Sequence, residues 1–497
     1  MKRLLIPLAA AGLSAVALVA PAEANPNWVS NDLLPKPAEA YSAAYFWLDA
    51  NGAALRKATQ YTLDTKTVPK LVATGSKSGV TDGKPGSTAP TGVGSQPGKA
   101  SQVNLPKTIG KVFFQDSKGN FRWCSATSIQ SRNRNLAVTA RHCVFENGKD
   151  DVYKKWVFVP GSYQGKAPWG VYAGAYAFTT YDVDTYDDYD GDYAFVAVHN
   201  GFSLAGEKIV TAKEYKQWTG DKWVKPKEIT AAEFLKCQLN LGDCWSEGQD
   251  KAAEPVGPDY PGAVVEKVEA GKTAYGAART GKGNGFKFGA PVTEQVTEAV
   301  YNAYNGPGDK AKTTTGNYTI TRYYTQKWVK PGTSRKYYEA QYTLGLVKDM
   351  GRLGDVVGGQ GFSWNQPLGQ QVTAFGYPAD PHPDGNKAFT GVTPKWCAGK
   401  TATKSYQINT FKVETHQVLK CSMTGGADGG PWLMKYNNSK RSGYVNGVTS
   451  VFADNDGNGR IDYISSAIFD GETADVYNKA NYAVTKKIVG PNGEMLK

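Results

Sequence analysis

The chain has 497 residues, of which 40% are hydrophobic and 21% charged, and its formal net charge is +12. This length allows two or three ordinary domains, or one large β domain that carries insertions. The positive charge is spread along the chain, and no recognisable nucleic-acid-binding module is present. We therefore expect loose adsorption to anionic polymers and no specific binding of nucleic acid.

Residues 1–24 have the pattern of a secretory signal peptide. Two basic residues at positions 2–3 precede an apolar run at 4–20, and Ala22-Glu23-Ala24 suits cleavage before Asn25. No other stretch reaches the roughly 18 consecutive apolar residues that a membrane-spanning helix needs. The sequence therefore predicts a secreted, extracellular protein without membrane insertion.

The segment 25–104 is predicted to be an N-terminal arm or pro-region. One helix is expected over 38–61, although Gly52 weakens it. Residues of about 75–101 are rich in Gly, Ser, Thr, Pro and Lys, and have too little apolar surface to offset the entropy of ordering. We expect this part to be a linker.

Short β-rich runs separated by Gly, Asn and Asp begin at Ile109 and predict a sandwich or a barrel. The expected strands lie at 111–114, 123–127, 136–139, 156–159 and 194–198. The β pattern returns at 356–357 and continues at 371–378 and 444–452, before a terminal helix at 471–480 and a tail at 486–497. One domain at 105–485 is therefore expected.

We expect an insertion at about 201–350 to interrupt this domain, because these residues are richer in Lys and Tyr than the segments on either side. Thr230 and Glu233 have the spacing of a capping box that opens a short helix. The alternating runs 318–329 and 336–346 predict a hairpin through Pro331-Gly332.

The chain has six cysteines, which in a secreted protein are most simply three disulfides. A zinc site is the alternative, but no pair has the C-x-x-C spacing that such sites usually show. Cys237 and Cys244 would close a small loop within the insertion.

Three motifs carry the candidate chemistry. Thr139-Ala-Arg-His-Cys143 follows an apolar strand that would hold His142 rigidly, and Gly191-Asp192 begins a second strand. The glycine-rich loop Cys421–Trp432 comes last. This order of His, Asp and nucleophile loop is one of the known orders of a catalytic triad, in which a carboxylate orients the base and amides bind the oxyanion.

The chain resembles the secreted trypsin-like, chymotrypsin-fold serine peptidases, above all the bacterial branch whose last motif reads Met-Thr-Gly-Gly-Ser-Ser-Gly-Gly-Pro-Trp. Here Met423-Thr-Gly-Gly-Ala-Asp-Gly-Gly-Pro-Trp432 differs at two positions, and Arg141 is the one departure from the family's histidine motif. The resemblance covers roughly 230 residues. It implies an all-β fold of two six-stranded antiparallel barrels with a C-terminal helix, into which the insertion is placed.

The resemblance also implies roles for individual residues. His142 matches the general base, Asp192 its orienting carboxylate, and Gly426 an oxyanion-hole donor together with the amide of residue 428. Ser422, Ser450 and Phe452 match substrate-binding positions, and the uncharged Ser422 argues against a preference for Lys or Arg. The implied disulfides of the barrels are Cys124–Cys143 and Cys397–Cys421.

Asp428 matches the position of the nucleophile serine. A carboxylate that attacks an amide would give a mixed anhydride, which is less stable than the substrate, and its charge would raise the pKa of His142. We therefore predict a non-catalytic pseudopeptidase that binds a protein or peptide ligand as a monomer. The alternatives are an active extracellular serine-type endopeptidase that cleaves peptide bonds, and a divalent-metal site at His142, Asp192 and Asp428.

No cofactor is expected, and a structural calcium ion is the one candidate. Asp454, Asp456, Asn458 and Asp462 are spaced like part of an EF-hand loop, but the twelfth position is Ser465 rather than Glu, and a hairpin turn is the alternative. The aspartates within 182–190 could also bind calcium, although a solvated acidic loop is the simpler interpretation.

Overall fold

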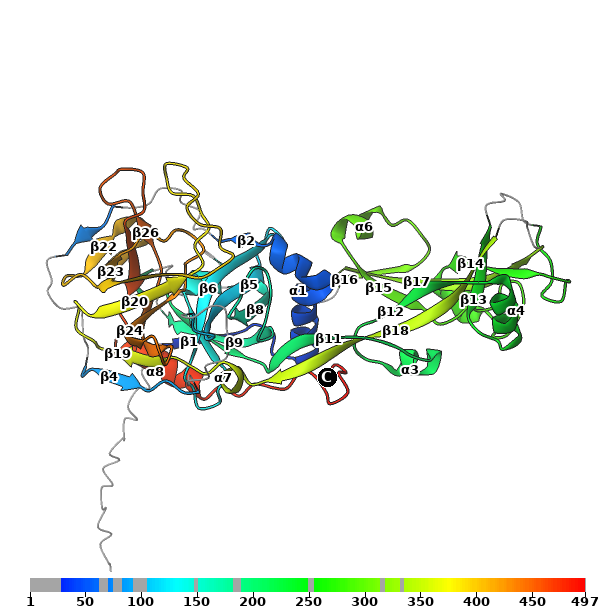
Figure 1. Cartoon of the computed structure of the whole chain (residues 1–497), viewed down its shortest axis with the longest axis horizontal. Helices are drawn as coiled ribbons and strands as arrows, with labels where there is room; N and C mark the ends of the chain where they lie inside the picture. Colours follow the sequence, from blue (N-terminus) through cyan, green and yellow to red (C-terminus); the bar gives the residue numbers. More distant parts are fainter. Residues whose placement is uncertain are drawn as a thin grey trace, which may run out of the picture.

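A computed structural model of the chain shows a β-rich body and a long arm that projects from one side of it (Figure 1). The structure describes residues 28–61, 70–74, 83–92, 105–146, 151–181, 189–248, 254–312, 318–330 and 335–496. The predicted signal peptide, much of the predicted linker, the Pro331-Gly332 turn and all of the acidic run except Asp190 lie outside these residues. Within them, no helix combines the length and the apolar character needed to cross a bilayer.

Six antiparallel strands form one closed barrel in the body. Their order is β9-β10-β7-β6-β5-β8, and pairing of β8 with β9 closes the ring. The strands are β5 (Ile109–Gln115), β6 (Phe121–Ile129), β7 (Leu136–Thr139), β8 (Lys154–Pro160), β9 (Tyr172–Thr180) and β10 (Ala194–Val198). The sequence analysis did not predict β9, in which the stretch Ala173-Gly174-Ala175 lacks the β-branched residues that mark strands.

The second half of the body is a half-barrel, made of two sheets rather than one closed ring. One sheet has the order β21-β20-β24-β25-β19-β4 and the other β26-β27-β23-β22-β3. The bounds of the first are β21 (Lys395–Lys400), β20 (Gln371–Gly376), β24 (Pro431–Asn437), β25 (Ser442–Val448), β19 (Gly361–Trp364) and β4 (Gly86–Thr88). Those of the second are β26 (Phe452–Ala453), β27 (Tyr463–Ala467), β23 (Val413–Lys420), β22 (Tyr406–Ile408) and β3 (Val72–Ala73). The expectation of two closed six-stranded barrels therefore holds for the first only.

Two helices of the body belong to the C-terminal part of the chain. The expected terminal helix is α8 (Gly471–Asn481), where the Asp470 side chain accepts a hydrogen bond from the Thr473 amide. A short helix, α7 (Leu353–Val356), stands where the sequence predicted that the β pattern would return. Leu353 is fully buried in the barrel core, so its apolar character reflects packing rather than a strand.

The N-terminal segment is packed on both halves of the body. Strand β1 (Trp28–Asp32) extends the barrel sheet beside β9, and helix α1 (Pro37–Lys57) buries Trp47, whose indole Nε1 donates to the Lys155 carbonyl at 2.7 Å. Strand β2 (Thr59–Gln60) then pairs with β6, whereas β3 and β4 join the two sheets of the half-barrel.

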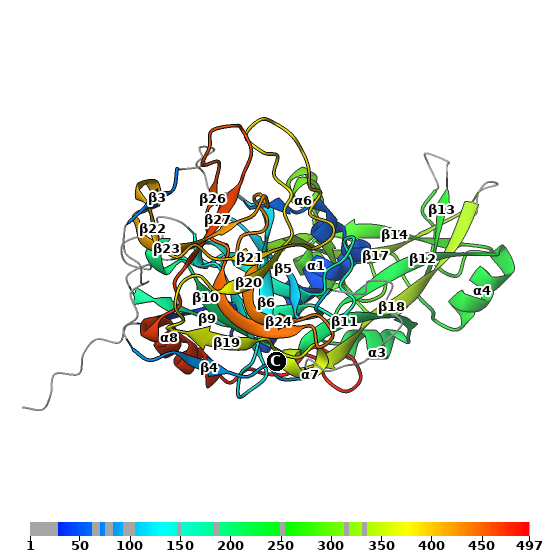
Figure 2. The same ribbon diagram turned by 60° about the vertical axis from the view of Figure 1, so that its left-hand side comes forward.

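The arm consists of two sheets of its own (Figure 2). In the first, β11 (Gly201–Ile209), β12 (Lys222–Ile229) and β13 (Cys244–Gly248) all pair with β18 (Arg335–Gly351). In the second, β14 (Val264–Ala270), β15 (Val292–Val296) and β16 (Asp309–Lys312) pair with β17 (Tyr318–Val329). The predicted hairpin is wrong in its pairing, because β17 and β18 are the central strands of different sheets.

Short helices α3 (Ala212–Gln217), α4 (Ala231–Leu239), α5 (Lys272–Ala277) and α6 (Glu298–Ala303) connect the strands of the arm. The predicted capping box is present at α4, where the Thr230 side chain accepts from the Glu233 amide and the Glu233 side chain accepts from the Thr230 amide. An apolar cluster that includes Phe234, Trp245 and Trp328 packs between the elements at the tip. The arm therefore has a core of its own.

Candidate active site

His142 and Asp192 meet where two barrel strands end. The chain leaves β7 at Thr139 and makes a short 3-10 turn, Arg141–Cys143, that carries His142; Asp192 lies two residues before β10. The Nδ1 atom of His142 is 2.7 Å from Asp192 Oδ2, and the His142 amide donates to Asp192 Oδ1 at 3.1 Å. These two contacts fix the ring and leave its Nε2 atom facing away from Asp192.

Three disulfides are present, and they are the pairs that the sequence analysis expected. Cys124–Cys143 ties strand β6 to the turn that carries His142. Cys397–Cys421 joins β21 to the start of the glycine-rich loop, and Cys237–Cys244 lies in the arm. Disulfides are typical of oxidising compartments such as the extracellular space.

The glycine-rich loop folds over strand β6 in a conformation that other residues would not allow. Gly426 has φ +96° and Gly429 has φ +75°, and a Cβ atom at Gly429 would lie 2.0 Å from the Thr139 hydroxyl. Ser125 holds the loop from beneath: its amide donates to the Asp428 carbonyl at 2.8 Å and its hydroxyl to the Gly426 carbonyl at 2.7 Å. The position of residue 428 is therefore fixed by the barrel.

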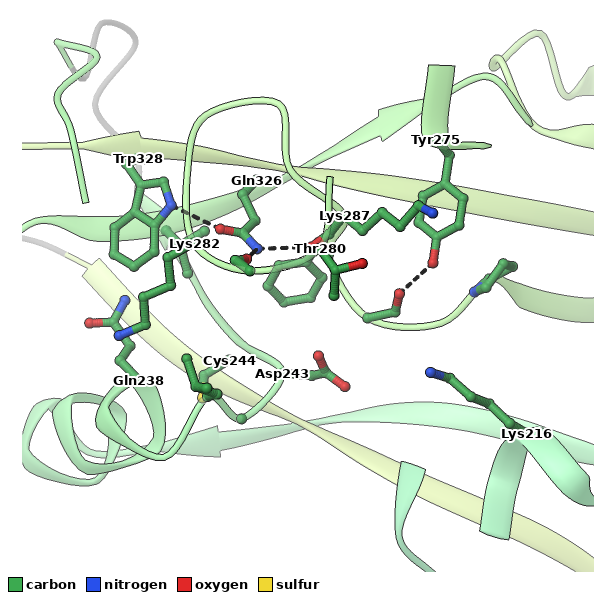
Figure 3. A pocket seen from close by; sticks show the side chains of 17 residues that line it. Lys216, Gln238, Asp243, Cys244, Tyr275, Thr280, Lys282, Lys287, Gln326 and Trp328 are labelled. Atoms are coloured by element: carbon green, nitrogen blue, oxygen red, sulfur yellow. Dashed lines mark hydrogen bonds between the residues drawn. The ribbon is translucent and has the colours of Figure 1, made fainter. Parts of the chain in front are cut away.

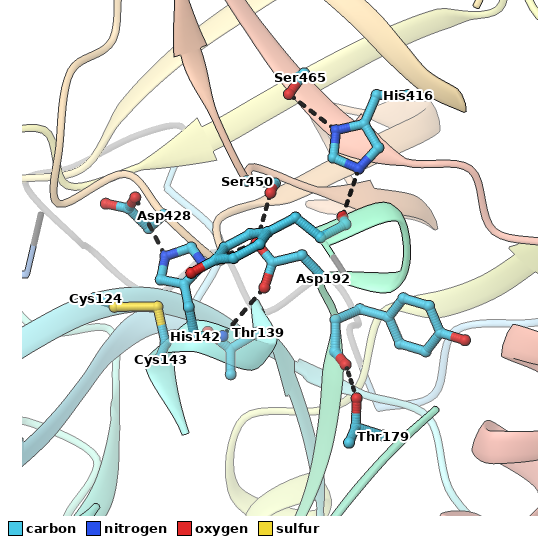
Figure 4. Close-up of polar contacts among 12 residues, drawn as sticks. Cys124, Thr139, His142, Cys143, Thr179, Asp192, His416, Asp428, Ser450 and Ser465 are labelled. Atoms are coloured by element: carbon cyan, nitrogen blue, oxygen red, sulfur yellow. Dashed lines mark hydrogen bonds and ion pairs between the residues drawn. A yellow bond between two sulfur atoms is a disulfide. The ribbon is translucent and has the colours of Figure 1, made fainter. Parts of the chain in front are cut away.

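The side chain of Asp428 lies between the imidazole and the loop amides (Figure 4). Its Oδ1 atom is 3.4 Å from His142 Nε2, which is an ion-pair distance rather than a well-formed hydrogen bond. Its Oδ2 atom accepts a hydrogen bond of 2.6 Å from the Gly426 amide. The imidazole thus has a carboxylate at each of its two nitrogen atoms.

These contacts and the burial of the site shift the pKa values of all three groups. Burial acts to lower the pKa of His142, but Asp192 and then Asp428 outweigh it and raise this pKa from 6.5 to about 10. Burial also acts to raise the pKa of Asp192, but His142 and Ser450 hold that pKa below its usual value. The pKa of Asp428 is raised by burial, against the opposing effects of His142 and the Gly426 amide. The two carboxyl groups thus favour the protonated form of His142.

Aromatic side chains close the site from the solvent. Tyr61 follows directly after β2, and its ring stacks on the His142 ring with 5.7 Å between ring centroids and 26° between planes. The ring of Tyr189 also lies near the His142 ring, at 6.1 Å between centroids. The side chains of His142 and Asp428 have exposed fractions of 0% and 1%. A peptide cannot reach His142 or Asp428 in this conformation.

The three residues expected to bind substrate do not gather around the triad equally. Ser450 does reach it, because its hydroxyl donates to Asp192 Oδ2 at 2.5 Å. Phe452 is half-buried against the cluster that contains Met423, and Ser422 is exposed. Only Ser450 is part of the buried polar network.

Sequence reasoning did not identify Ser125 or Tyr61. Ser125 belongs to the Cys-Ser-Ala-Thr strand motif, so the resemblance to the peptidase family could have predicted its position beneath the loop. Tyr61 is 81 residues from His142 along the chain, and only the path of the N-terminal segment brings the two rings together.

The geometry does not favour a metal ion shared by the triad residues, because the two carboxylates lie at opposite nitrogen atoms of the imidazole. Among the described residues the grouping of possible ligands with the right spacing is Cys124, His142 and Cys143, but its two sulfur atoms form a disulfide. This grouping therefore offers no thiolate ligand.

In the candidate calcium loop, the carboxylates hold the turn itself. Asp454 accepts from the amides of Asn458 and Gly459, Asp456 from the amide of Asn458, and Asp462 from the amide of Asn455. Calcium binding at Asp454, Asp456, Asn458 and Asp462 stays a prediction.

No family model matches the sequence, and no curated protein matches it. Solved structures with a similar fold include the protease Anisep from Arthrobacter nicotinovorans, at 18% identity and TM-score 0.41 over 77% of this chain and 99% of that chain. A thermostable serine protease, AL20, from an extremophilic microorganism has 17% identity and TM-score 0.40 over 76% and 98%. A Glu endopeptidase has 10% identity and TM-score 0.35 over 78% and 96%. All three similarities are distant, since each identity is below 20% and each TM-score is below 0.5.

Proposed function

We propose that this protein is a secreted, non-catalytic homologue of the trypsin-like serine peptidases in which Asp428 stands at the position of the nucleophile. The observation that carries the proposal is the place of the Asp428 carboxylate, with one oxygen facing His142 Nε2 and the other bound to the Gly426 amide. In an enzyme that transfers acyl groups, the nucleophile faces the imidazole nitrogen, and the oxyanion of the intermediate binds to the loop amide.

The chemistry of a carboxylate at this position argues against peptide cleavage. Its attack on an amide would have to form a mixed anhydride and expel an amine, and the anhydride is less stable than the amide. Occupation of the Gly426 amide also removes a donor that would stabilise the oxyanion. Loss of the nucleophile from such a triad lowers turnover by roughly a millionfold.

The state of His142 supports the same conclusion. A general base must accept a proton from the nucleophile, and it works best with a pKa near the operating pH. The two carboxylates raise the pKa of His142 to about 10, so at neutral pH its Nε2 atom already carries a proton. His142 then acts as a buried counter-ion rather than as a base.

We propose a binding or scaffolding role in place of catalysis. The three disulfides are consistent with an extracellular location, and the arm offers an exposed surface for a protein or peptide ligand. A monomer is proposed for the free protein.

The test compares the mature protein with Asp428→Ala and Asp428→Ser variants, incubated with unfolded casein and a fluorophosphonate probe. We expect neither cleavage nor labelling for the unmodified protein and for Asp428→Ala. Casein cleavage by the unmodified protein that disappears in Asp428→Ala would contradict the proposal and favour the active endopeptidase. Labelling of Asp428→Ser at residue 428 would show that the site keeps the geometry of a nucleophile loop.

A further inference from the structure

The arm contains a cavity of about 490 Å³, which is lined by residues of the insertion alone (Figure 3). Cavities of about 300–1,000 Å³ are typical of small-molecule sites. The wall is formed by one residue each of α3, α4, β14 and α5, by residues 241–244, by the loop between α5 and β15, and by strand β17. Its polar side chains are Lys216, Gln238, Asp243, Thr280, Lys282, Lys287 and Gln326.

The loop that carries Lys282 and Lys287 is held in place by one amide side chain. Gln326 Oε1 accepts from the Gly283 amide at 3.2 Å and from the Trp328 indole at 3.0 Å. Gln326 Nε2 donates to the carbonyls of Gly281 and Lys287 at 2.6 and 2.8 Å. All donors and acceptors of this amide are therefore used, and the basic loop is pre-organised against β17.

The cavity carries an excess of positive charge. Three lysines line it, against the single carboxylate of Asp243, which accepts a hydrogen bond from the Tyr342 hydroxyl. Within the described ranges, neither Lys216 nor Lys282 has a carboxylate at ion-pair distance, whereas six other lysines of the arm do. The ammonium groups are thus available to an anion.

A buried donor and an apolar face complete the site. The Nε2 atom of Gln238 is buried and has no hydrogen-bond partner among the described residues, and Figure 3 shows Gln238 and Lys282 at the same end of the cavity. An unused buried donor is unfavourable, and an acceptor on a ligand would remove that penalty. Tyr275, Phe288 and Trp328 supply the apolar part of the wall.

We propose that this cavity binds a small organic anion, a carboxylate or a phosphate ester, that has an apolar or ring-shaped body. The anionic group would lie beside Lys282 and the Gln238 amide at one end of the cavity, and its body would extend past Phe288 towards Tyr275 and Lys287 at the other end (Figure 3). Electrostatic attraction would give the preference for an anion, and burial of the body would supply affinity that inorganic phosphate lacks.

The test is a calorimetric titration of the full mature protein with 4-phenylbutyrate, with its neutral amide and with inorganic phosphate. We expect saturable binding of the carboxylate, and binding at least about tenfold weaker for the amide, a difference of about 1.4 kcal/mol. The double variant K282M/K287M should weaken carboxylate binding by at least about tenfold as well. Lys208→Met is the matched control, because Lys208 is exposed on β11 and does not line the cavity.

Equal affinity for the carboxylate and its amide would overturn the proposal, as would unchanged carboxylate binding in K282M/K287M. The absence of saturable carboxylate binding would overturn it too. Retained binding in Lys208→Met, together with loss in K282M/K287M, would place the anion at the loop. The unfolding midpoint of each variant shows whether a loss reflects the site or the fold.

Discussion

The triad region of the body and the cavity of the arm use charge in opposite ways. At the triad, two carboxyl groups lie at the two nitrogen atoms of one buried imidazole, and the ring of Tyr61 stacks on that imidazole. In the arm, lysines face an open cavity with one carboxylate among them. On the two proposals made above, the triad groups stabilise the body, whereas the groups that can bind a ligand lie in the arm.

The largest difference between the regions should appear when one charge is removed from each. His142→Ala leaves Asp192 and Asp428 buried without their counter-ion, so it should lower the free energy of unfolding by about 3–5 kcal/mol. Lys282→Met, on the exposed loop of the arm, should change it by less than about 0.5 kcal/mol. Denaturant unfolding measures both. Equal effects would mean that the triad is not an electrostatic unit of the body.

The dependence of stability on pH should separate the regions next. The pKa of His142 is higher in the folded protein than in the unfolded chain, so its stabilising effect is complete below about pH 6.5 and is lost as the pH rises towards about 10. One proton is released on unfolding in this window, which corresponds to about 1.4 kcal/mol per pH unit at most.

The variant Asp428→Asn tests this assignment, because it removes one of the two carboxylates that raise the pKa of His142. The loss of stability should still begin near pH 6.5, the pKa of the unfolded chain, but it should be smaller and should end at a lower pH. Unfolding midpoints measured between pH 6 and pH 10 give both curves. Identical curves would show that Asp428 does not act on His142.

A smaller effect is expected from opening the site. In the Asp428→Ser background, Tyr61→Ala should raise the rate of fluorophosphonate labelling by about tenfold, because removal of the ring lowers the barrier to reaching the hydroxyl at residue 428 by about 1.4 kcal/mol. Tyr61→Phe keeps the ring and should leave the rate unchanged. An unchanged rate in Tyr61→Ala would mean that another group limits access.

The smallest effect concerns the surface of the arm. Lys336 and Glu228 form an exposed ion pair at 3.3 Å, with side-chain exposures of 65% and 59%. Exposed pairs contribute about 0–1 kcal/mol, so Lys336→Gln should change the unfolding free energy by less than about 1 kcal/mol, and high salt should abolish the change. A larger loss would indicate that charge also holds the arm together.

Local patterns were enough to predict the strand ends that carry His142 and Asp192. Each residue follows or precedes a short apolar run, and β7 and β10 were found where those runs lie. The capping box at Thr230 was also predictable, since it depends only on residues three positions apart. Such features are encoded within a few residues of one another.

Pairings between distant segments were not predictable in the same way. The runs that became β17 and β18 have the alternation of strands, but alternation does not specify a partner, and each strand became the centre of its own sheet. The stacking of Tyr61 on His142 likewise depends on where α1 and β2 dock. The second barrel failed to close because its strands are shared between two sheets, which no periodicity reveals.

Strand β18 gives the arm a mechanical property. Its 17 residues span about 55 Å without a break, and directly beyond it the fully buried Leu353 is anchored in the barrel core. Strand β11 pairs with β18 where the arm meets the body, and its residue Phe202 is buried in the core of the body. The arm is therefore held firmly at its base. A force applied near its tip would be transmitted along β18 to the barrel.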